Sequence, residues 1–107
     1  MRRFDPIFVR IGGISGSKVT PGEITPLEPT TIISMYVEEE GLYTELNVYD
    51  SEGNEVRTLL NQSLSAESHH LVWDGTDDYS NLLHNGVYFV KINVRNNTHI
   101  MPLVINR

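Results

Sequence analysis

Three carboxylate side chains and one amide side chain follow the single tryptophan of the chain. Asp74, Asp77, Asp78 and Asn81 all lie within residues 73–81. Calcium binds about 6–8 oxygen atoms of carboxylate, carbonyl and amide groups, so these four residues are the candidate metal ligands of the sequence. Their spacing lacks the alternating acidic positions of an EF-hand loop. We therefore favour turn formation as their role, and predict neither a metal site nor a cofactor.

The turn interpretation explains the same residues one at a time. Trp73 follows Leu71 at a spacing of two, which places both side chains on one face of a strand. We predict that this face points into the core. Asp74 and Gly75 then take the chain off the strand, because an aspartate side chain can accept hydrogen bonds from free backbone N–H groups.

Other residues that could do chemistry lack the partners that it requires. His69 and His70 are adjacent, so on a strand they point to opposite faces and do not bind one ion together. His84 and His99 have no histidine or carboxylate partner near them in sequence, and residues 38–40 are a run of like charges before a glycine. No serine lies in a Gly-x-Ser-x-Gly elbow, and no glycine-rich loop continues with Lys and Ser or Thr. We predict no catalytic residues and no enzyme activity.

Tyrosine side chains suggest one further kind of site. Aromatic rings can stack on sugars, and Trp73 and Tyr88 are removed from this role by their predicted place in the core. Tyr49 and Tyr79 are the candidate ligand-facing residues, with Tyr43 a weaker third. A carbohydrate-binding β-sandwich module is therefore an alternative function.

The composition describes one globular domain. The chain has 107 residues, no cysteine and a formal net charge of −6, with eight scattered Lys and Arg residues. Nucleic-acid binding is disfavoured, because it requires basic residues clustered on one face. No apolar run approaches the ~20 residues of a membrane span. We also predict no signal peptide in "MRRFDPIFVRIGG", because Asp5, Pro6 and Arg10 interrupt its apolar residues.

Hydrophobic residues alternate with a period of two along most of the chain. The alternating stretches are residues 30–39, 44–50, 54–60, 69–74, 86–95 and 98–106. Residues 7–11 either form a short edge strand or belong to whatever precedes this domain. Turn residues separate them at 50–55, 84–86 and 95–98. This pattern predicts an all-β fold, an antiparallel β-sandwich of about seven strands resembling immunoglobulin and fibronectin type III domains. The predicted core centre is Leu46, Val48, Val56, Leu71, Trp73, Tyr88, Val90 and Ile92.

The first quarter of the chain differs from the rest in composition. Residues 12–29 are rich in Gly, Ser and Pro, and Pro21, Pro26 and Pro29 oppose regular strand pairing. We therefore divide the chain into a lead-in or linker at residues 1–24 and a sandwich domain at residues 25–107.

Three stretches carry a resemblance to a known family. "ELNVYDSEGNEVRTLL" (45–60), "HHLVWDGTDD" (69–78) and "NGVYFVKI" (85–92) resemble the immunoglobulin-like domain of flagellar hook-capping proteins, a domain that also ends many secreted bacterial surface proteins. The signature residues are Val48, Tyr49, Asp50, Gly53, Val56, Leu59, Trp73, Asp74, Gly75, Gly86, Val87 and Tyr88. Ser80 departs from the pattern, because the family usually has glycine there. If a positive φ is needed at this turn, either Ser80 or Asn81 must adopt it.

The resemblance implies a non-catalytic structural or adhesive module at the C-terminus of a larger secreted or cell-surface protein, where it mediates protein–protein assembly, secretion or anchoring. Hook assembly is an alternative, although residues 1–24 do not resemble the N-terminal region of hook-capping proteins. The ending "HIMPLVINR" resembles the tails of C-terminal sorting domains. The expected location is extracellular or at the cell surface. The expected partners are proteins, with polysaccharide as the alternative, and self-association through residues 7–11 or 98–106 is a further expectation.

Overall fold

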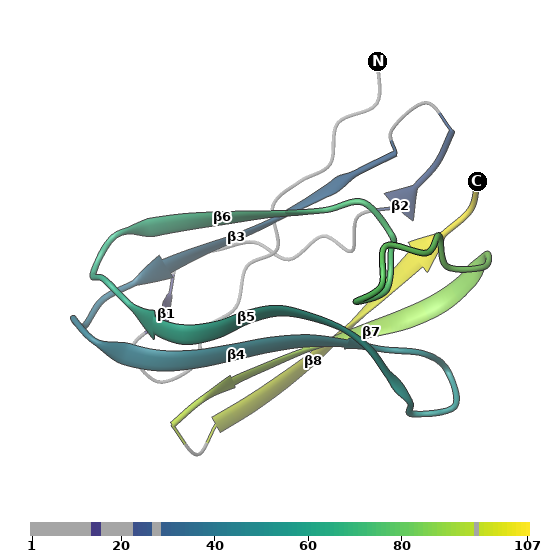
Figure 1. The fold of residues 1–107 in the computed structure, drawn as a ribbon. Coiled ribbons are helices and arrows are strands. Elements are labelled where there is room, and N and C mark those ends of the chain that lie inside the picture. The colour runs from purple at the N-terminus through teal and green to yellow at the C-terminus, as the bar shows by residue number, and fades with distance from the viewer. Residues whose placement is uncertain (1–13, 16–22, 27–28, 96) are drawn as a thin grey trace.

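The protein is a sandwich of two β-sheets in the computed structural model, which describes residues 14–15, 23–26, 29–95 and 97–107 (Figure 1). The strands are β1 (Ile14–Ser15), β2 (Glu23–Ile24), β3 (Thr31–Val37), β4 (Leu42–Tyr49), β5 (Glu55–Leu64), β6 (Ser68–Trp73), β7 (Gly86–Val94) and β8 (Asn97–Ile105). The first sheet has the order β1-β3-β6 and the second the order β2-β8-β7-β4-β5. The predicted all-β sandwich is therefore confirmed.

The long strands β3 to β8 coincide with the alternating stretches of the sequence. Every neighbouring pair is antiparallel except β2 and β8, which are parallel. The short strands β1 and β2 were not predicted. The edge strand expected at residues 7–11 lies outside the described residues.

The core lies between the sheets and follows the period-two pattern. Leu46, Val48, Trp73, Tyr88, Val90 and Ile92 are buried, as predicted. Val56 and Leu71 are only partly buried and pack against the rim of the core, so their predicted central place was wrong. Both residues lie on strands at a sheet edge, β5 and β6, where one flank has no neighbouring strand to cover it.

Two short pairings attach the predicted lead-in to the sandwich. β1 pairs with β3, and β2 pairs in parallel with the last two residues of β8. Ile24 has no exposed surface and belongs to the core cluster. Pairing within residues 12–29 does therefore occur, although it is limited to two residues at each strand.

The predicted hairpins at 50–55 and 95–98 are both present. Gly53 has a φ of +89° between β4 and β5, whereas its neighbour Asn54 does not have a positive φ. Arg95, with a φ of +57°, begins the turn between β7 and β8. In the described part of the chain no helix is long and apolar enough to cross a membrane.

Candidate functional site

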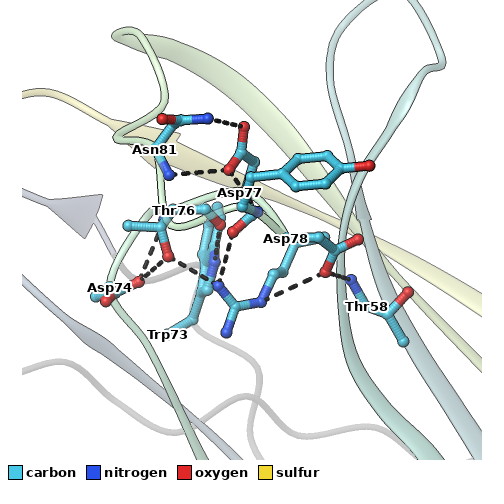
Figure 2. Close-up of polar contacts among 9 residues, drawn as sticks. Thr58, Trp73, Asp74, Thr76, Asp77, Asp78 and Asn81 are labelled. Atoms are coloured by element: carbon cyan, nitrogen blue, oxygen red, sulfur yellow. Dashed lines mark hydrogen bonds and ion pairs between the residues drawn. The ribbon is translucent and has the colours of Figure 1, made fainter.

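The predicted site begins at the tryptophan. Trp73 has 1% of its surface exposed and meets Tyr88 edge-on, with the ring centroids 6.3 Å apart and the ring planes at 74°. Its indole Nε1–H donates to the carbonyl oxygen of Thr76 at 3.0 Å (Figure 2). The ring therefore packs in the interior, and its one polar atom is satisfied by the loop that follows.

Asp74 directs the turn after the strand. Its Oδ1 accepts hydrogen bonds from the backbone N–H of Thr76 at 3.2 Å and from the Thr76 hydroxyl at 2.5 Å. Gly75 has a φ of +76°, a conformation that glycine adopts without a steric penalty. Asp74 thus closes the turn as the sequence predicted.

Asp77 organises the next turn, residues 77–81. We call this turn the second acidic loop, because a similar turn occurs earlier in the chain, at residues 50–54. Its Oδ1 accepts the backbone N–H groups of Tyr79 and Asn81, both at 2.9 Å, and its Oδ2 accepts the Asn81 side-chain amide at 3.3 Å (Figure 2). These hydrogen bonds favour the ionised form. The Asn81 and Tyr79 N–H groups, the Asn81 amide and the nearby Arg57 charge together lower the pKa of Asp77 below its ordinary value.

Asp78 faces a different element, the edge of β5. Its Oδ1 accepts the backbone N–H of Thr58 at 3.0 Å (Figure 2). Its own N–H donates to the carbonyl oxygen of Val56 at 3.1 Å. Arg57, which lies on β5, also binds this connection. Its Nη1 donates to Thr76 Oγ1 at 2.8 Å and to the Asp77 carbonyl at 3.0 Å. One loop residue therefore pairs with β5 as a short strand would.

The candidate calcium ligands do not converge. Asp74 binds its own turn, Asp77 binds the second acidic loop, and Asp78 binds β5. Within the described residues no group of three or more His, Cys, Asp or Glu side chains is arranged to hold a metal ion. The carboxylates are used as hydrogen-bond acceptors for the protein itself.

The same arrangement occurs a second time, in the first acidic loop (residues 50–54). Asp50 Oδ1 accepts the N–H groups of Glu52 and Asn54, and its Oδ2 accepts the Asn54 side-chain amide. Hydrogen bonds led by the Asn54 N–H lower the pKa of Asp50. Gly53 occupies the positive-φ position here, whereas Ser80 occupies it in the second acidic loop with a φ of +66°. The question left by the sequence is thereby answered: Ser80, not Asn81, takes the left-handed conformation.

Two arginines that sequence reasoning missed hold the connection between β6 and β7 in place. Besides Arg57, Arg107 donates from Nη1 to the Leu83 carbonyl at 2.7 Å and from Nη2 to the Asp74 and Gly75 carbonyls at 2.8 and 3.1 Å. A Cβ added to Gly75 would lie 2.3 Å from Arg107 Nη2. The positive φ therefore favours glycine there, and a larger residue would also displace the Arg107 guanidinium from its hydrogen bonds. No local pattern reveals either arginine, because their partners are at least 19 residues away in the sequence.

The remaining signature residues lie around this framework. Tyr88 is buried, and its hydroxyl donates to the His84 carbonyl at 2.7 Å; burial, followed by the Asp50 charge, raises the pKa of Tyr88. Val87 is 44% exposed on the outer face of β7. Leu59 is partly buried against the core. Gly86 begins β7 with a φ of +154°.

The two candidate ligand-facing tyrosines differ in their surroundings. Tyr49 is half-buried, its hydroxyl donates to Glu55 Oε1 at 3.4 Å, and Lys91 Nζ lies 5.7 Å from its ring centroid. Burial and the Glu55 charge raise the pKa of Tyr49. Tyr79 is 85% exposed. A hollow of about 490 Å³ is lined by Tyr49, Asp50, Ser51, Gly53, Phe89, Lys91 and Ile100, and Tyr79 is not part of its lining.

The adjacent histidines point to opposite faces, as predicted. The His69 ring nitrogen Nε2 lies 2.8 Å from the Ser65 carbonyl on the inner side, and His70 Nδ1 lies 2.8 Å from Ser34 Oγ on the outer side. Both rings are thus engaged with neighbouring oxygen atoms of the sheet.

Comparison with known proteins agrees with this fold. A sequence model described as the FlgD Ig-like domain matches residues 23–98. The structure is similar to that of FlgD from P. aeruginosa, with a TM-score of 0.56 and 22% identity over 78% of this chain and 69% of that one. It is also similar to PorZ, described as an essential surface component of the type-IX secretion system of Porphyromonas gingivalis, with a TM-score of 0.52 and 17% identity over 81% of this chain.

The likeness to PorZ concerns a small part of that protein, since the chain spans 11% of its length. A search of curated proteins with the sequence gave no match. At these levels of identity the two solved structures establish the fold, and the family match establishes the type of domain.

Proposed function

The chain belongs to the FlgD Ig-like domain family, and from this premise we propose that it is a non-catalytic structural or adhesive module of a larger exported bacterial protein. In this role it folds on its own and mediates protein–protein assembly or secretion and anchoring. The observation that carries the proposal is the use of the signature acids. Asp50, Asp74, Asp77 and Asp78 all accept hydrogen bonds that shape the fold, so the most concentrated set of reactive groups serves the scaffold.

An extracellular or cell-surface location is part of this proposal. The likeness to a protein described as a surface component of a secretion system supports it, as does the resemblance to domains that end exported proteins. An exported module must also stay folded outside the cell, where cytoplasmic chaperones do not act on it. The short, hydrogen-bonded turns at both acidic loops are suited to that requirement.

The test is deletion in the bacterium that produces the protein. Removing the codons for residues 25–107 should release the partners that co-purify with the intact gene product after cross-linking, and should reduce its exposure to external protease. A gene product without the domain that keeps its partners and its surface exposure would contradict the proposal. If the partners recovered are rod and hook subunits, the assembly in question is the flagellar hook.

Saccharide binding is a second candidate, favoured by the hollow beside Tyr49. Its lining combines the Tyr49 and Phe89 rings with the Asp50 and Lys91 side chains, and its volume of about 490 Å³ falls in the usual range for small ligands. Affinity electrophoresis against a polysaccharide panel tests it. Retardation that Tyr49→Ala abolishes and Tyr79→Ala preserves would favour this function over assembly, whereas unchanged mobility on every polysaccharide would remove it.

A further inference from the structure

The sandwich protects its sheet edges unequally. Unpaired N–H and C=O groups along an edge strand can recruit a strand from another chain, so natural proteins cover, shorten or interrupt most edges. The edge strands here are β1 and β6 in one sheet and β2 and β5 in the other. β1 and β2 are two residues long, so they cover only the end of β3 and the end of β8. Along the same flanks, residues 31–35 of β3 and 97–103 of β8 have no neighbouring strand among the described residues.

The edge of β5 is covered by the second acidic loop. Asp78 donates its N–H to the Val56 carbonyl and accepts the Thr58 N–H through its carboxylate. Arg57, between them, is tied to the same loop. The N-terminal part of β5 thus has its outward backbone groups satisfied from within the chain.

The edge of β6 has no such cover among the residues that the structure describes. The N–H of Val37 donates to the Glu67 carbonyl at 3.0 Å, which sets the phase of the antiparallel ladder between β3 and β6. Backbone groups alternate in direction along such a ladder. Residues 67, 69, 71 and 73 therefore bond to β3, and Ser68, His70 and Val72 direct their N–H and C=O groups away from it.

The residues of β6 do nothing to discourage pairing. The strand is "SHHLVW", with no proline, lysine or arginine, the residues that commonly blunt an exposed edge. Val72, 63% exposed, and Ile32, 46% exposed, pair across the outer face of the same sheet. β6 is therefore a regular strand on which Ser68, His70 and Val72, at every second residue, can pair with another strand.

A hollow lies beside the start of β6. It has a volume of about 380 Å³ and is lined by Glu40, Gly41, Gln62, Ser63, Leu64, Ser65 and His69. The Glu40 carboxylate is fixed in this wall, because its Oε2 accepts the Ala66 N–H at 2.7 Å. A strand added to β6 would place an inward side chain near this hollow, where the carboxylate favours a cation.

We propose that β6 is the docking edge of the module and that it accepts an extended strand of another protein, which carries a Lys or Arg side chain into the hollow beside Glu40. This inference rests on the assembly function proposed above and assigns it to one surface. Main-chain hydrogen bonds to Ser68, His70 and Val72 supply affinity, and the hollow supplies specificity.

Charge selects a different protein over a second copy of this chain. Each copy carries a formal net charge of −6, so two copies repel one another. Symmetric antiparallel pairing of two β6 strands about His70 would place Glu67 of each copy opposite Trp73 of the other, with no Lys or Arg on either strand. A basic strand complements both the net charge and Glu40.

The experiment is an NMR titration of the chain with a capped peptide of alternating Thr and Val that carries one central Lys. We expect the amide signals of Ser68, His70 and Val72 to shift, and the same peptide with Glu in place of Lys to bind more weakly. His70→Pro removes an outward N–H and the side-chain contact with Ser34 but leaves the backbone hydrogen bonds to β3, and should weaken binding about ten-fold or more. Ile32→Thr, which changes the outer face on β3 without changing the charge, should leave the affinity unchanged.

A second pair of variants tests the hollow. Glu40→Gln keeps the acceptor for Ala66 but removes the charge, and should weaken binding of the Lys peptide about two- to five-fold without weakening that of the Glu peptide. Glu52→Gln, which changes the net charge equally at the distant first acidic loop, is the matched control. Shifts confined to other strands, equal binding of both peptides, or dimerisation through β6 without peptide binding would overturn the inference.

The deletion test separates this inference from the proposed function. If deletion of residues 25–107 releases the partners and His70→Pro in the intact gene product does not, the docking edge is wrong and the assembly function stands. If deletion releases nothing, the assembly function itself fails.

Discussion

The two acidic loops have one local structure and two different surroundings. In residues 50–54 and in residues 77–81, an aspartate accepts the N–H groups two and four residues ahead and the side-chain amide of an asparagine. The backbone hydrogen bonds also match, with N–H to O distances of 2.9 and 3.1 Å in each loop. The same Asp-x-x-x-Asn spacing therefore occurs in both turns, each with one residue at positive φ.

Their surroundings separate the two loops. The first acidic loop joins β4 to β5 within one sheet and is exposed. The second lies on the connection from β6 to β7, between the two sheets. There Trp73 binds the preceding Thr76, Arg57 binds the Asp77 carbonyl, and Asp78 within the loop binds β5. Local sequence thus fixes the shape of a turn, and long-range contacts decide whether that turn supports the rest of the fold.

Trp73 and Tyr49 are the aromatic residues just before the two connections, and replacing them should give the largest difference in stability. Trp73→Ala should lower the free energy of unfolding by about 3–5 kcal/mol, because it empties a buried site and frees the connection that includes the second loop. Tyr49→Ala should cost less than about 1.5 kcal/mol, since Tyr49 is only half-buried. Urea denaturation of both variants measures the difference. Equal losses would mean that the two connections are anchored alike.

Arg57, which ties the second acidic loop to β5, should give the next largest loss of stability. Arg57→Ala should cost about 1–2 kcal/mol, because it removes hydrogen bonds from a charged donor to Thr76 and to the Asp77 carbonyl. Arg95→Ala, which breaks an exposed pair with Glu39, should cost about 0–1 kcal/mol. Chemical denaturation again compares them, and an Arg57 variant as stable as the Arg95 variant would show that the tie to β5 contributes nothing.

Substitutions at the positive-φ position of the two loops should change the stability of the fold in opposite directions. Ser80→Gly should stabilise the fold by about 0.5–1 kcal/mol by relieving a left-handed serine, and Gly53→Ser should destabilise it by about 1 kcal/mol. Thermal melting of both variants provides the measurement. A loss of stability in Ser80→Gly would indicate that the serine hydroxyl makes a contribution larger than the backbone strain.

Acid should weaken both loops, and this is the smallest expected effect. The pKa values of Asp50 and Asp77 are lowered in the folded protein, so their contribution is complete above the unfolded value of about 3.9 and is lost as the pH falls through the folded values. Melting temperature should therefore decline below about pH 4. Asp77→Asn should flatten this decline more than Asp50→Asn, because Arg57 also favours ionised Asp77.

Sequence patterns predicted the fold well because the relevant signals are local. Alternation placed β3 to β8, and the spacing of Leu71 and Trp73 gave the inward face of β6. The resemblance identified the family on its signature residues. What the pattern could not give is position within a sheet: Val56 and Leu71 alternate like core residues, but lie on edge strands.

The candidate site was predicted less completely. The role of Asp74 follows from turn chemistry, whereas the pairing of Asp78 with β5 depends on how two distant segments meet. The contacts of Arg57 and Arg107 are long-range in the same way. The open edge of β6 is also invisible in sequence, since a strand pattern does not say which neighbours the strand has.

The central claim is that the acidic residues after Trp73 serve the scaffold and not a bound ion. Its most direct test is the melting temperature of the chain in millimolar calcium and in chelator. We predict the same midpoint in both, because Asp74, Asp77 and Asp78 already accept protein hydrogen bonds and do not converge. A midpoint that rises several degrees with calcium would contradict the account, because only binding to the folded state stabilises it in that way.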